Sequence, residues 1–320
     1  MALPRITVTR KLPTAVEDRL RGLFDVACNA EDAPVARGRL EATFDAADGV
    51  LTTITESVDR ALLMRPARNV AIVANFGVGV NNIDLDAARE AGVIVTNTPD
   101  VLTDATADLA LALTLAATRR MSETERALRE GRWDGFRATQ WLGMGLQGKV
   151  MGIVGMGRIG QATARRAQAA FGMRVVYFNR SAVAGLDFPA EAKASIEAVM
   201  AEADVVSLHI PGGPANRGLI SAKMIGLMKP TAYLVNTARG DVVDEPALVA
   251  ALASGRIAGA GLDVYAAEPE VPAGLLALES VTLLPHVGSA TIETRTAMGM
   301  LAVDNLEAHF AGKPLPSRVV

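Results

Sequence analysis

Cysteine is almost absent from this chain, because Cys28 is the only one among 320 residues. A single thiol cannot close an intramolecular disulfide or build a cysteine-rich zinc site, so the sequence excludes both. Neither sign of charge dominates, since 32 Lys and Arg stand against 35 Asp and Glu. Without a basic excess the chain is poorly suited to holding nucleic-acid phosphates, and we expect no nucleic-acid partner. Scarce cysteine also suits a reducing compartment, so we expect a cytoplasmic protein.

Long apolar runs are missing too, as are several metal and hydrolase motifs. The most apolar stretch, 105–117, is too short to span a membrane and contains Asp108, so it predicts a buried helix and no membrane span. The opening Met-Ala-Leu-Pro-Arg-Ile has no apolar stretch of signal-peptide length. No HExxH, CxxC or GxSxG spacing occurs, which disfavours zinc-dependent and hydrolase chemistry, and we expect no metal.

Strand and helix patterns alternate along the chain. Short apolar, β-branched runs separated by helical patterns predict parallel sheets with helices on both faces. In a first series we expect strands at 5–9, 25–27, 49–53, 70–75 and 93–96. The helices of this series are expected at 14–23, 35–44, 58–64 and 85–90. Half of the residues are apolar, and the length suggests about two domains.

A long helix rich in Ala and Leu is expected over 103–129, between this series and a second one. Its stretch 105–117 is apolar on nearly every face, which places it either in a core or at a contact between subunits. The second series has expected strands at 149–154, 174–179, 205–209, 232–236, 259–263 and 282–284. Its helices are expected at 158–170, 191–201, 222–228, 245–254 and 292–310. Six strands with interleaved helices match the size of a dinucleotide-binding unit.

A GxGxxG sequence lies between a predicted strand and a predicted helix, which makes it a specific sign of a dinucleotide site rather than an ordinary tight turn. The first glycine permits the turn, the second lets the backbone approach a pyrophosphate, and the third lets helix and strand pack closely. The free N–H groups at the start of the helix favour the diphosphate charge. The motif residues expected to bind the cofactor are Gly155, Met156, Gly157, Arg158, Ile159 and Gly160.

The end of the following strand distinguishes the two nicotinamide dinucleotides. An NAD site usually has Asp or Glu there, which bonds to the ribose 2′-hydroxyl and would repel a 2′-phosphate. This chain has Asn179 instead, followed by Arg180 and Ser181. An arginine fork and a hydroxyl suit a phosphate, so the sequence predicts NADP(H) as the preferred cofactor and leaves NAD(H) open. The alternative is that Arg180 is only a solvated surface charge.

Hydride transfer to a keto acid needs a proton donor, and the chain has three histidines. His286 follows a predicted strand and precedes small residues that permit close approach of a ligand. His209 also ends a strand, at the edge where ligands collect in such folds, and a cofactor-side or packing role fits it. His309 lies in the last predicted helix, where we expect a solvated or structural side chain.

Two charged residues follow neighbouring predicted strands and suit the same chemistry. Glu268 is a carboxylate that would orient the ring of His286 and favour its protonated form, which keeps the histidine a proton donor. Arg239 offers a bidentate clamp for a substrate carboxylate and a dipole partner for the keto oxygen. Any one of the three could be a surface ion pair, but three at successive strand ends of one sheet predict a catalytic site.

Four motifs together resemble the D-isomer-specific 2-hydroxyacid dehydrogenase family over nearly the whole chain. They are Gly155–Gly160, Asn236-Thr-Ala-Arg-Gly240, Gly261-Leu-Asp-Val-Tyr with Glu268-Pro269, and Pro285-His-Val-Gly-Ser289. The resemblance implies that Arg239, Glu268 and His286 are catalytic. It also implies that Asp263 accepts a hydrogen bond from the nicotinamide amide and that Thr106 contacts the nicotinamide end. Further cofactor contacts are expected from His209, Pro211, Thr237, Ala238 and Gly288.

The loop Asn75-Phe-Gly-Val-Gly-Val-Asn81 resembles the substrate loop of the family. This implies that Asn75 and the backbone amides of Val78 and Gly79 bind substrate. The loop continues Val80-Asn81-Asn82, where many relatives have Asp before the Asn. Trp141 and Leu142 resemble a segment that glyoxylate/hydroxypyruvate reductases extend toward the neighbouring subunit's active site, so Trp141 is expected to bind substrate. The alternative for Trp141 is simple packing at the interface.

The resemblance also implies an α/β fold with two Rossmann-like or flavodoxin-like domains, parallel sheets, and an active site in the interdomain cleft. A substrate domain is expected at 1–98, completed by 291–320, and a dinucleotide-binding domain at 99–290. Family members are usually dimers, and we expect a homodimer.

The sequence therefore predicts an NADP(H)-preferring oxidoreductase that reduces small 2-keto acids such as glyoxylate and hydroxypyruvate. Phosphoglycerate and 2-ketogluconate dehydrogenases share the motifs, although many phosphoglycerate dehydrogenases carry a C-terminal regulatory domain and this sequence stops at Val320. A phosphite dehydrogenase is disfavoured because it has lysine where Asn75 stands. A non-catalytic dinucleotide-binding corepressor stays as a different class of function, opposed by the complete set of catalytic residues.

Overall fold

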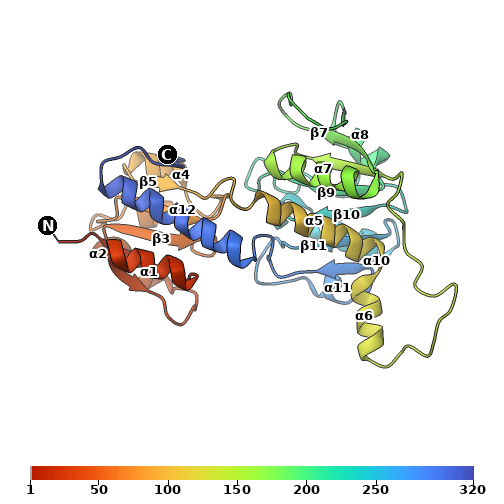
Figure 1. Cartoon of the computed structure of the whole chain (residues 1–320), viewed down its shortest axis with the longest axis horizontal. Coiled ribbons are helices and arrows are strands. Elements are labelled where there is room, and N and C mark those ends of the chain that lie inside the picture. Colours follow the sequence, from red (N-terminus) through yellow and green to blue (C-terminus); the bar gives the residue numbers. More distant parts are fainter. Residues whose placement is uncertain (1) are drawn as a thin grey trace. The chain divides into compact units, whose positions relative to one another are not determined.

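The structure, a computed structural model, describes residues 2–320. The chain forms two compact units: Met1–Leu102 with Ser289–Val320, and Thr103–Gly288 (Figure 1). Each unit contains one parallel β-sheet. Within residues 2–320, no helix combines the length and apolar character that crossing a membrane requires.

The first unit has a five-stranded sheet in the order β2-β1-β3-β4-β5. Its strands are β1 (Arg5–Val8), β2 (Asp25–Cys28), β3 (Gly49–Thr53), β4 (Ile72–Phe76) and β5 (Ile94–Thr96). Its helices are α1 (Thr14–Leu23), α2 (Arg37–Ala46), α3 (Arg60–Leu63), α4 (Leu85–Glu90) and α12 (Ile292–Phe310). The last helix therefore joins a sheet formed almost 200 residues earlier in the chain.

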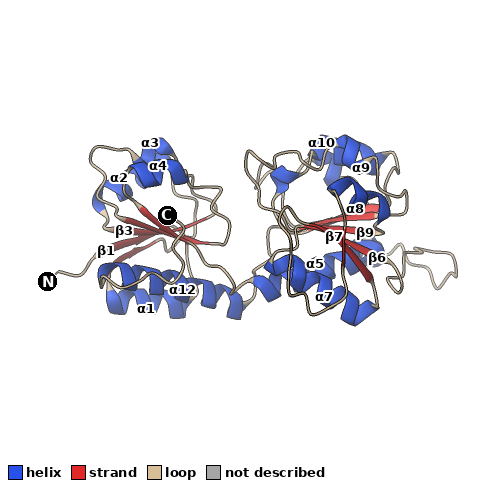
Figure 2. Cartoon of the chain, turned by 90° about the horizontal axis from the view of Figure 1, so that it is seen from above, coloured by secondary structure: helices blue, strands red, loops and turns tan. Residues whose placement is uncertain are grey.

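Helices cover both faces of this sheet, with α1 and α12 on one side and α2, α3 and α4 on the other (Figure 2). Successive side chains of β3 point to opposite faces. Val50 therefore packs with Phe44 of α2, and Leu51 packs with Leu306 of α12. Gly299 allows α12 to approach α1, because a Cβ there would lie 2.5 Å from a methyl carbon of Val16.

The second unit has a seven-stranded sheet in the order β12-β11-β10-β9-β6-β7-β8. Its strands are β6 (Val150–Val154), β7 (Arg174–Phe178), β8 (Glu191–Ala192), β9 (Val205–Leu208), β10 (Tyr233–Asn236), β11 (Gly259–Leu262) and β12 (Val281–Leu283). Its helices are α5 (Thr103–Thr118), α6 (Met121–Arg129), α7 (Arg158–Phe171), α8 (Ile196–Glu202), α9 (Ala222–Ile225), the 3-10 turn η1 (Gly240–Val242), α10 (Glu245–Ala253) and α11 (Ala273–Leu276). The order changes direction between β6 and β9, the kind of position at which such folds bind ligands.

This sheet too is covered on both faces, by α5 and α7 on one side and by α8, α9 and α10 on the other (Figure 2). Met151 and Ile153 of β6 pack toward α5 and α7, while Val150 and Val154 pack in the opposite core. The fold class predicted from the sequence, two α/β domains with parallel sheets, is confirmed.

Two predicted helices were wrong in their bounds. The helix expected over 103–129 is broken, because α5 ends at Thr118 and Arg120 adopts a left-handed φ of 53° before α6 begins. A distant segment causes the break: the N–H of Met144 donates to the carbonyl oxygen of Thr118 at 2.8 Å.

The helix expected from residue 191 begins only at Ile196, and Glu191 lies in the short edge strand β8, the seventh strand of the sheet. Ser195 is the N-cap of the helix, since its hydroxyl accepts from the N–H of Ala198 at 3.3 Å. A capping serine stabilises a helix start by about 1 kcal/mol.

Candidate functional site

The glycine motif forms the turn between β6 and α7. Gly155 has a φ of 98°, and a Cβ there would lie 2.5 Å from the carbonyl oxygen of His209, so only glycine fits. A Cβ on Gly160 would lie 2.2 Å from the carbonyl oxygen of Gly155. A Cβ on Gly157, in contrast, would meet no atom of the chain within 4 Å. The first and third glycines are thus needed for packing, and the second leaves open space beside the start of α7.

The tip of the motif is held by the end of β7. Asn179 accepts a hydrogen bond from the N–H of Met156 at 3.1 Å and donates to the carbonyl oxygen of Ser181 at 2.8 Å. Gln161 also donates to the carbonyl oxygen of Met156, at 3.1 Å. Asn179 therefore fixes the glycine motif. It also occupies the position at which an NAD site usually has a carboxylate.

Arg158 and Ile159 begin α7, and no side chain caps its N-terminus. Arg180 and Ser181 follow β7 and are exposed. Among residues 2–320, no acidic side chain forms an ion pair with Arg180, which leaves its guanidinium available. An uncapped helix start of this kind attracts anions.

A short turn after β10 presents Thr237, Ala238 and Arg239. Asn236 shapes it by accepting from the N–H of Ala238 at 3.0 Å and donating to the carbonyl oxygen of Arg239 at 2.8 Å. The hydroxyl oxygen of Thr237 is buried and has no hydrogen-bond partner in the described chain. Buried polar atoms normally have partners, so this hydroxyl fits a site that a polar ligand completes.

Arg239 lies against the segment that follows β11. The next residue, Gly240, packs so closely there that a Cβ would lie 1.9 Å from the carbonyl carbon of Tyr265. The guanidinium donates to the carbonyl oxygen of Ala238 at 2.7 Å. Burial lowers the pKa of Arg239, although the charges of Glu268 and Asp241 oppose the shift. Arginine remains protonated at neutral pH, so the site contains a fixed positive charge.

His286 and Glu268 form a short hydrogen bond, with 2.6 Å between Nδ1 of the histidine and Oε2 of the glutamate. The other carboxylate oxygen accepts from the N–H of Tyr265 at 3.0 Å. Burial raises the pKa of Glu268, but the hydrogen bond from His286 and the charge of Arg239 outweigh burial and leave this pKa below its ordinary value. An ionised Glu268 accepts only, so Nδ1 carries the proton and Nε2 is the atom that can exchange a proton with a ligand.

The backbone at His286 is strained, with a φ of 54° that non-glycine residues seldom adopt. Such a conformation costs on the order of 1–3 kcal/mol and needs surrounding contacts to hold it. Asp263 supplies them, because its carbonyl oxygen accepts from His286 at 2.9 Å and its two carboxylate oxygens accept from Val287 and Gly288 at 2.8 Å each. Thr106 of α5 donates to the carbonyl oxygen of Gly288 at 3.3 Å.

The remaining predicted residues of the second unit lie in varied surroundings. His209 follows β9 and bonds to the hydroxyl of Ser207 at 2.9 Å, and burial lowers its pKa to about 4, so the ring is neutral at pH 7. Pro211 is exposed two residues later. Trp141 is partly exposed in the loop after α6, with a φ of 50°.

In the first unit, the loop after β4 has its carbonyl groups tied down. Asn75 donates to the carbonyl oxygens of Gly77 and Gly79 at 3.3 and 3.0 Å, and Asn97 donates to that of Val78 at 2.8 Å. Within residues 2–320, no acceptor bonds to the N–H of Val78 or Gly79. Free amides beside a fixed backbone suit an anionic ligand.

A family model described as "D-isomer specific 2-hydroxyacid dehydrogenase, NAD binding domain" matches residues 111–288, more than half of the chain. The chain belongs to this family. The glyoxylate reductase of Thermococcus litoralis is 41% identical, over 99% of this chain and 96% of its own length. The resemblance predicted from the motifs is therefore confirmed, and the chain is an NAD(P)-dependent oxidoreductase.

Solved structures agree with this assignment. The TT0316 protein of Thermus thermophilus has a TM-score of 0.91 and 43% identity, covering 99% of this chain and 100% of its own. An NADPH-dependent glyoxylate/hydroxypyruvate reductase of Sinorhizobium meliloti, solved with NADP and malonate, has a TM-score of 0.86 and 37% identity, covering 100% and 97%. The free Thr237 hydroxyl and the space at Gly157 fit the dinucleotide that family membership implies.

Several residues that shape the site were not predicted. Asn236, Tyr265 and Glu245 act on the backbone: the hydroxyl of Tyr265 donates to Leu284 at 2.9 Å, and Glu245 accepts from Ala266 at 2.9 Å. Burial raises the pKa of Tyr265 to about 12, so its hydroxyl stays a donor. Asn236 could have been predicted, because an asparagine at a strand end commonly bonds to the backbone of the turn that follows. The partners of Tyr265 and Glu245 depend on tertiary structure.

Proposed function

We propose that this protein is an NADP(H)-preferring reductase that converts glyoxylate or hydroxypyruvate to the corresponding 2-hydroxy acid. The observation that carries this proposal is the short hydrogen bond between His286 and ionised Glu268, with the charge of Arg239 close enough to lower the pKa of Glu268. A guanidinium can hold a carboxylate and polarise a keto group, and an imidazolium can protonate the oxygen. These are the requirements of keto-acid reduction.

In the proposed mechanism, Arg239 of the second unit binds the carboxylate of the keto acid. In the first unit, the unbonded N–H groups of Val78 and Gly79 are the groups proposed to bind substrate. When bound, a nicotinamide dinucleotide would supply the hydride for the keto carbon. His286 donates the proton on Nε2 to the keto oxygen, and Glu268 stabilises the charged ring until that transfer. Gly157, Thr237 and the start of α7 would hold the dinucleotide, and Asp263 and Thr106 would border its nicotinamide end.

The test of this function is turnover with a panel of glyoxylate, hydroxypyruvate, pyruvate and 2-ketogluconate, each with NADPH and with NADH. We expect the highest kcat/KM for glyoxylate or hydroxypyruvate with NADPH. A clear preference for 2-ketogluconate would replace the proposed substrate, and dinucleotide binding without turnover of any keto acid would support the corepressor instead.

The preference for NADP(H) rests on three residues after β7. Asn179 leaves no carboxylate to repel a 2′-phosphate, and exposed Arg180 and Ser181 offer a guanidinium and a hydroxyl. A structural relative, the Sinorhizobium meliloti reductase, is NADPH-dependent. The scarcity of cysteine suits a reducing compartment and supports the proposal that the reaction takes place in the cytoplasm.

Replacing Arg180 with serine should raise the KM for NADPH about 10- to 100-fold, because a hydrogen bond to a charged group contributes about 1.5–3 kcal/mol. The KM for NADH should stay within about twofold, since NADH has no 2′-phosphate to lose a contact. Arg165→Ser, a change at an exposed arginine on α7, serves as the control. An equal rise of the KM for NADPH and for NADH would show that Arg180 does not bind the 2′-phosphate.

We also propose a homodimer, joined through the segment 121–142, which we name the arm. Figure 1 shows α6 and the following loop projecting from the second unit. Large apolar side chains are exposed along it, including Phe136 at 90%, Leu142 at 65% and Leu128 at 59%. Apolar surface of this extent is typical of a protein contact, and Trp141 lies at its end.

A Leu128→Glu/Phe136→Glu double variant should convert a dimer to a monomer in sedimentation velocity at micromolar concentration. Burying charge in a contact opposes association strongly. Leu3→Glu, at an apolar residue that is 57% exposed outside the arm, should leave the dimer intact. A wild-type protein that sediments as a monomer at the same concentration would contradict the homodimer.

A further inference from the structure

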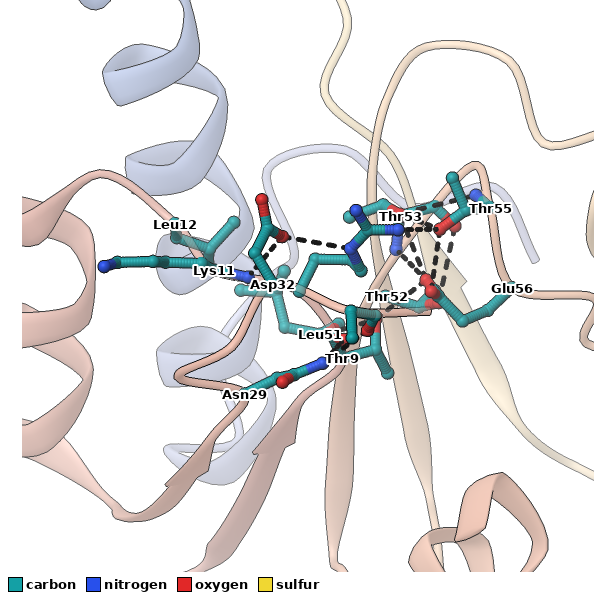
Figure 3. A network of polar contacts seen from close by, with 12 residues as sticks. Thr9, Lys11, Leu12, Asn29, Asp32, Leu51, Thr52, Thr53, Thr55 and Glu56 are labelled. Carbon is teal, nitrogen blue, oxygen red and sulfur yellow. Dashed lines mark hydrogen bonds and ion pairs between the residues drawn. The ribbon is translucent and has the colours of Figure 1, made fainter. Parts of the chain in front are cut away.

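A buried carboxylate that the proposed mechanism does not use lies three residues after β3. Glu56 is only 4% exposed. One of its oxygens, Oε2, accepts from the hydroxyls of Thr9, Thr52 and Thr53 at 2.8, 3.1 and 3.0 Å, and from the N–H of Thr53 at 3.0 Å. The other, Oε1, accepts from the hydroxyl of Thr55 at 2.7 Å (Figure 3).

This carboxylate is ionised and accepts five hydrogen bonds, and no basic side chain within residues 2–320 forms an ion pair with it. Burial opposes its ionisation, but the hydrogen bonds from Thr55, Thr53 and Thr9 outweigh burial and leave the pKa of Glu56 below its ordinary value. Thr9 directly follows β1, Thr52 and Thr53 end β3, and Thr55 lies in the turn after β3. The two strands are neighbours, because Val8 of β1 pairs with Leu51 of β3. Glu56 therefore fixes the turn 53–56 against the sheet.

Asn82 connects this turn to the loop after β4. Its side-chain amide donates to the carbonyl oxygens of Thr53 and Glu56 at 3.0 and 3.1 Å. It also donates to the side-chain oxygen of Asn75 at 3.3 Å. Asn75 in turn holds the carbonyl groups of Gly77 and Gly79. An unbroken series of hydrogen bonds thus runs from Glu56 to the backbone around the amides of Val78 and Gly79.

Backbone pairing reinforces the connection. Thr52 and Thr53 of β3 lie beside Asn75 and Phe76 of β4 in the sheet. The N–H of Val58 donates to the carbonyl oxygen of Asn82 at 2.8 Å. The segment carrying Glu56 and the loop 75–82 therefore form one hydrogen-bonded assembly within the first unit.

We propose that Glu56 is a positioning residue for the loop 75–82, which acts through Asn82 to aim the Val78 and Gly79 amides at the substrate carboxylate. This inference rests on the proposed function for its kinetic consequence. Glu56 itself touches no substrate. Its role is to keep the turn 53–56 in place, so that Asn82 donates to three oxygens at once and the loop amides point in a fixed direction.

Asn82→Asp is the sharpest test, because aspartate has the same shape but cannot donate to three oxygens. We expect the KM for glyoxylate to rise about tenfold or more, since a small misplacement of binding groups is costly, while kcat falls less. The Kd for NADPH should not change. Asn69→Asp makes the identical chemical change at an exposed residue of the first unit that lies outside the loop 75–82 and donates to Ala47 and Asp48, and it should leave both constants within about twofold.

Glu56→Ala should reproduce the KM effect of Asn82→Asp, and Glu56→Gln should restore part of it, because an amide oxygen can still accept from the N–H of Thr53. Glu17→Gln changes another buried carboxylate of the first unit, which is 8% exposed and bonds to Leu12 and Arg21. It should lower the melting temperature without changing KM. A KM unchanged in Asn82→Asp, or raised equally in Glu17→Gln, would overturn the proposal.

Amide hydrogen exchange of the peptide covering 75–82 separates this proposal from the proposed function, because it needs no substrate. Faster exchange there in Glu56→Ala and Asn82→Asp, but not in Asn69→Asp, supports positioning even if no keto acid is turned over. If exchange in both variants equals that of the wild type, and the wild-type enzyme reduces glyoxylate, the positioning role is rejected and the reductase function is retained.

Discussion

Replacing His286 with alanine should lower kcat for glyoxylate reduction by about 10²- to 10⁴-fold, the range that a positioned proton donor contributes. Nδ1 of the imidazole is already bonded to Glu268 at 2.6 Å, so Nε2 is the nitrogen left to exchange a proton with a ligand. The Kd for NADPH, measured by fluorescence titration, should stay within about twofold, because the glycine motif is untouched. Wild-type turnover in this variant would remove His286 from the proton transfer.

His309→Ala is the matched control, since it removes a partly buried histidine from α12 in the other unit. Burial lowers the pKa of His309 and no acidic side chain pairs with it among residues 2–320. Its replacement should change stability but not kcat. A loss of turnover in both variants would point to a general effect on folding.

Glu268→Gln tests the partner of the histidine through the pH profile. The pKa of Glu268 lies below its ordinary value, so the carboxylate is charged throughout the neutral range and accepts from Nδ1 of His286. In the wild type, kcat should fall as the pH drops through this lowered pKa, because a protonated Glu268 no longer holds the ring as a charged acceptor. Glutamine is not protonated in this range, so Glu268→Gln should lack that acid limb, and an acid limb retained in the variant would show that Glu268 only packs there.

The site residues at the strand ends were predictable because local sequence patterns mark where each strand ends. Arg239, Glu268 and His286 come after β10, β11 and β12, which lie side by side in the sheet. Parallel strands end at the same edge, so spacing alone brings such residues to one region. The capping Ser195 and the turn at Gly155 also have local signals, and only the first of them was overlooked.

Contacts between distant segments were not predictable in the same way. The break at Arg120 depends on Met144, which bonds to Thr118 from 26 positions along the chain. The five donors around Glu56 require the register of β1 against β3 and a turn that closes on itself. A threonine-rich stretch such as Leu51-Thr-Thr-Ile-Thr55 reads as an ordinary strand end until its neighbours are known.

Replacing Arg239 with methionine should lower kcat/KM for glyoxylate by about 10³-fold or more, because it removes a charged donor to both the carboxylate and the developing oxyanion. Methionine fills much of the same volume, which limits the loss of packing around Gly240. Arg239→Lys keeps the charge without the bidentate fork and should recover only part of the activity. The Kd for NADPH should be nearly unchanged in both.

The relation between Arg239 and Glu268 gives this prediction a second readout. The guanidinium is one of the charges that keep the pKa of Glu268 low. In Arg239→Met the acid limb of the kcat profile should therefore move to higher pH, because Glu268 becomes easier to protonate and no longer supports His286. Arg21→Met, at an exposed arginine of α1 that pairs with Glu17 and Asp18, should show neither effect. If Arg239→Met raises only the KM and leaves kcat and its pH profile as in the wild type, the guanidinium anchors the carboxylate but takes no part in stabilising the reacting oxygen.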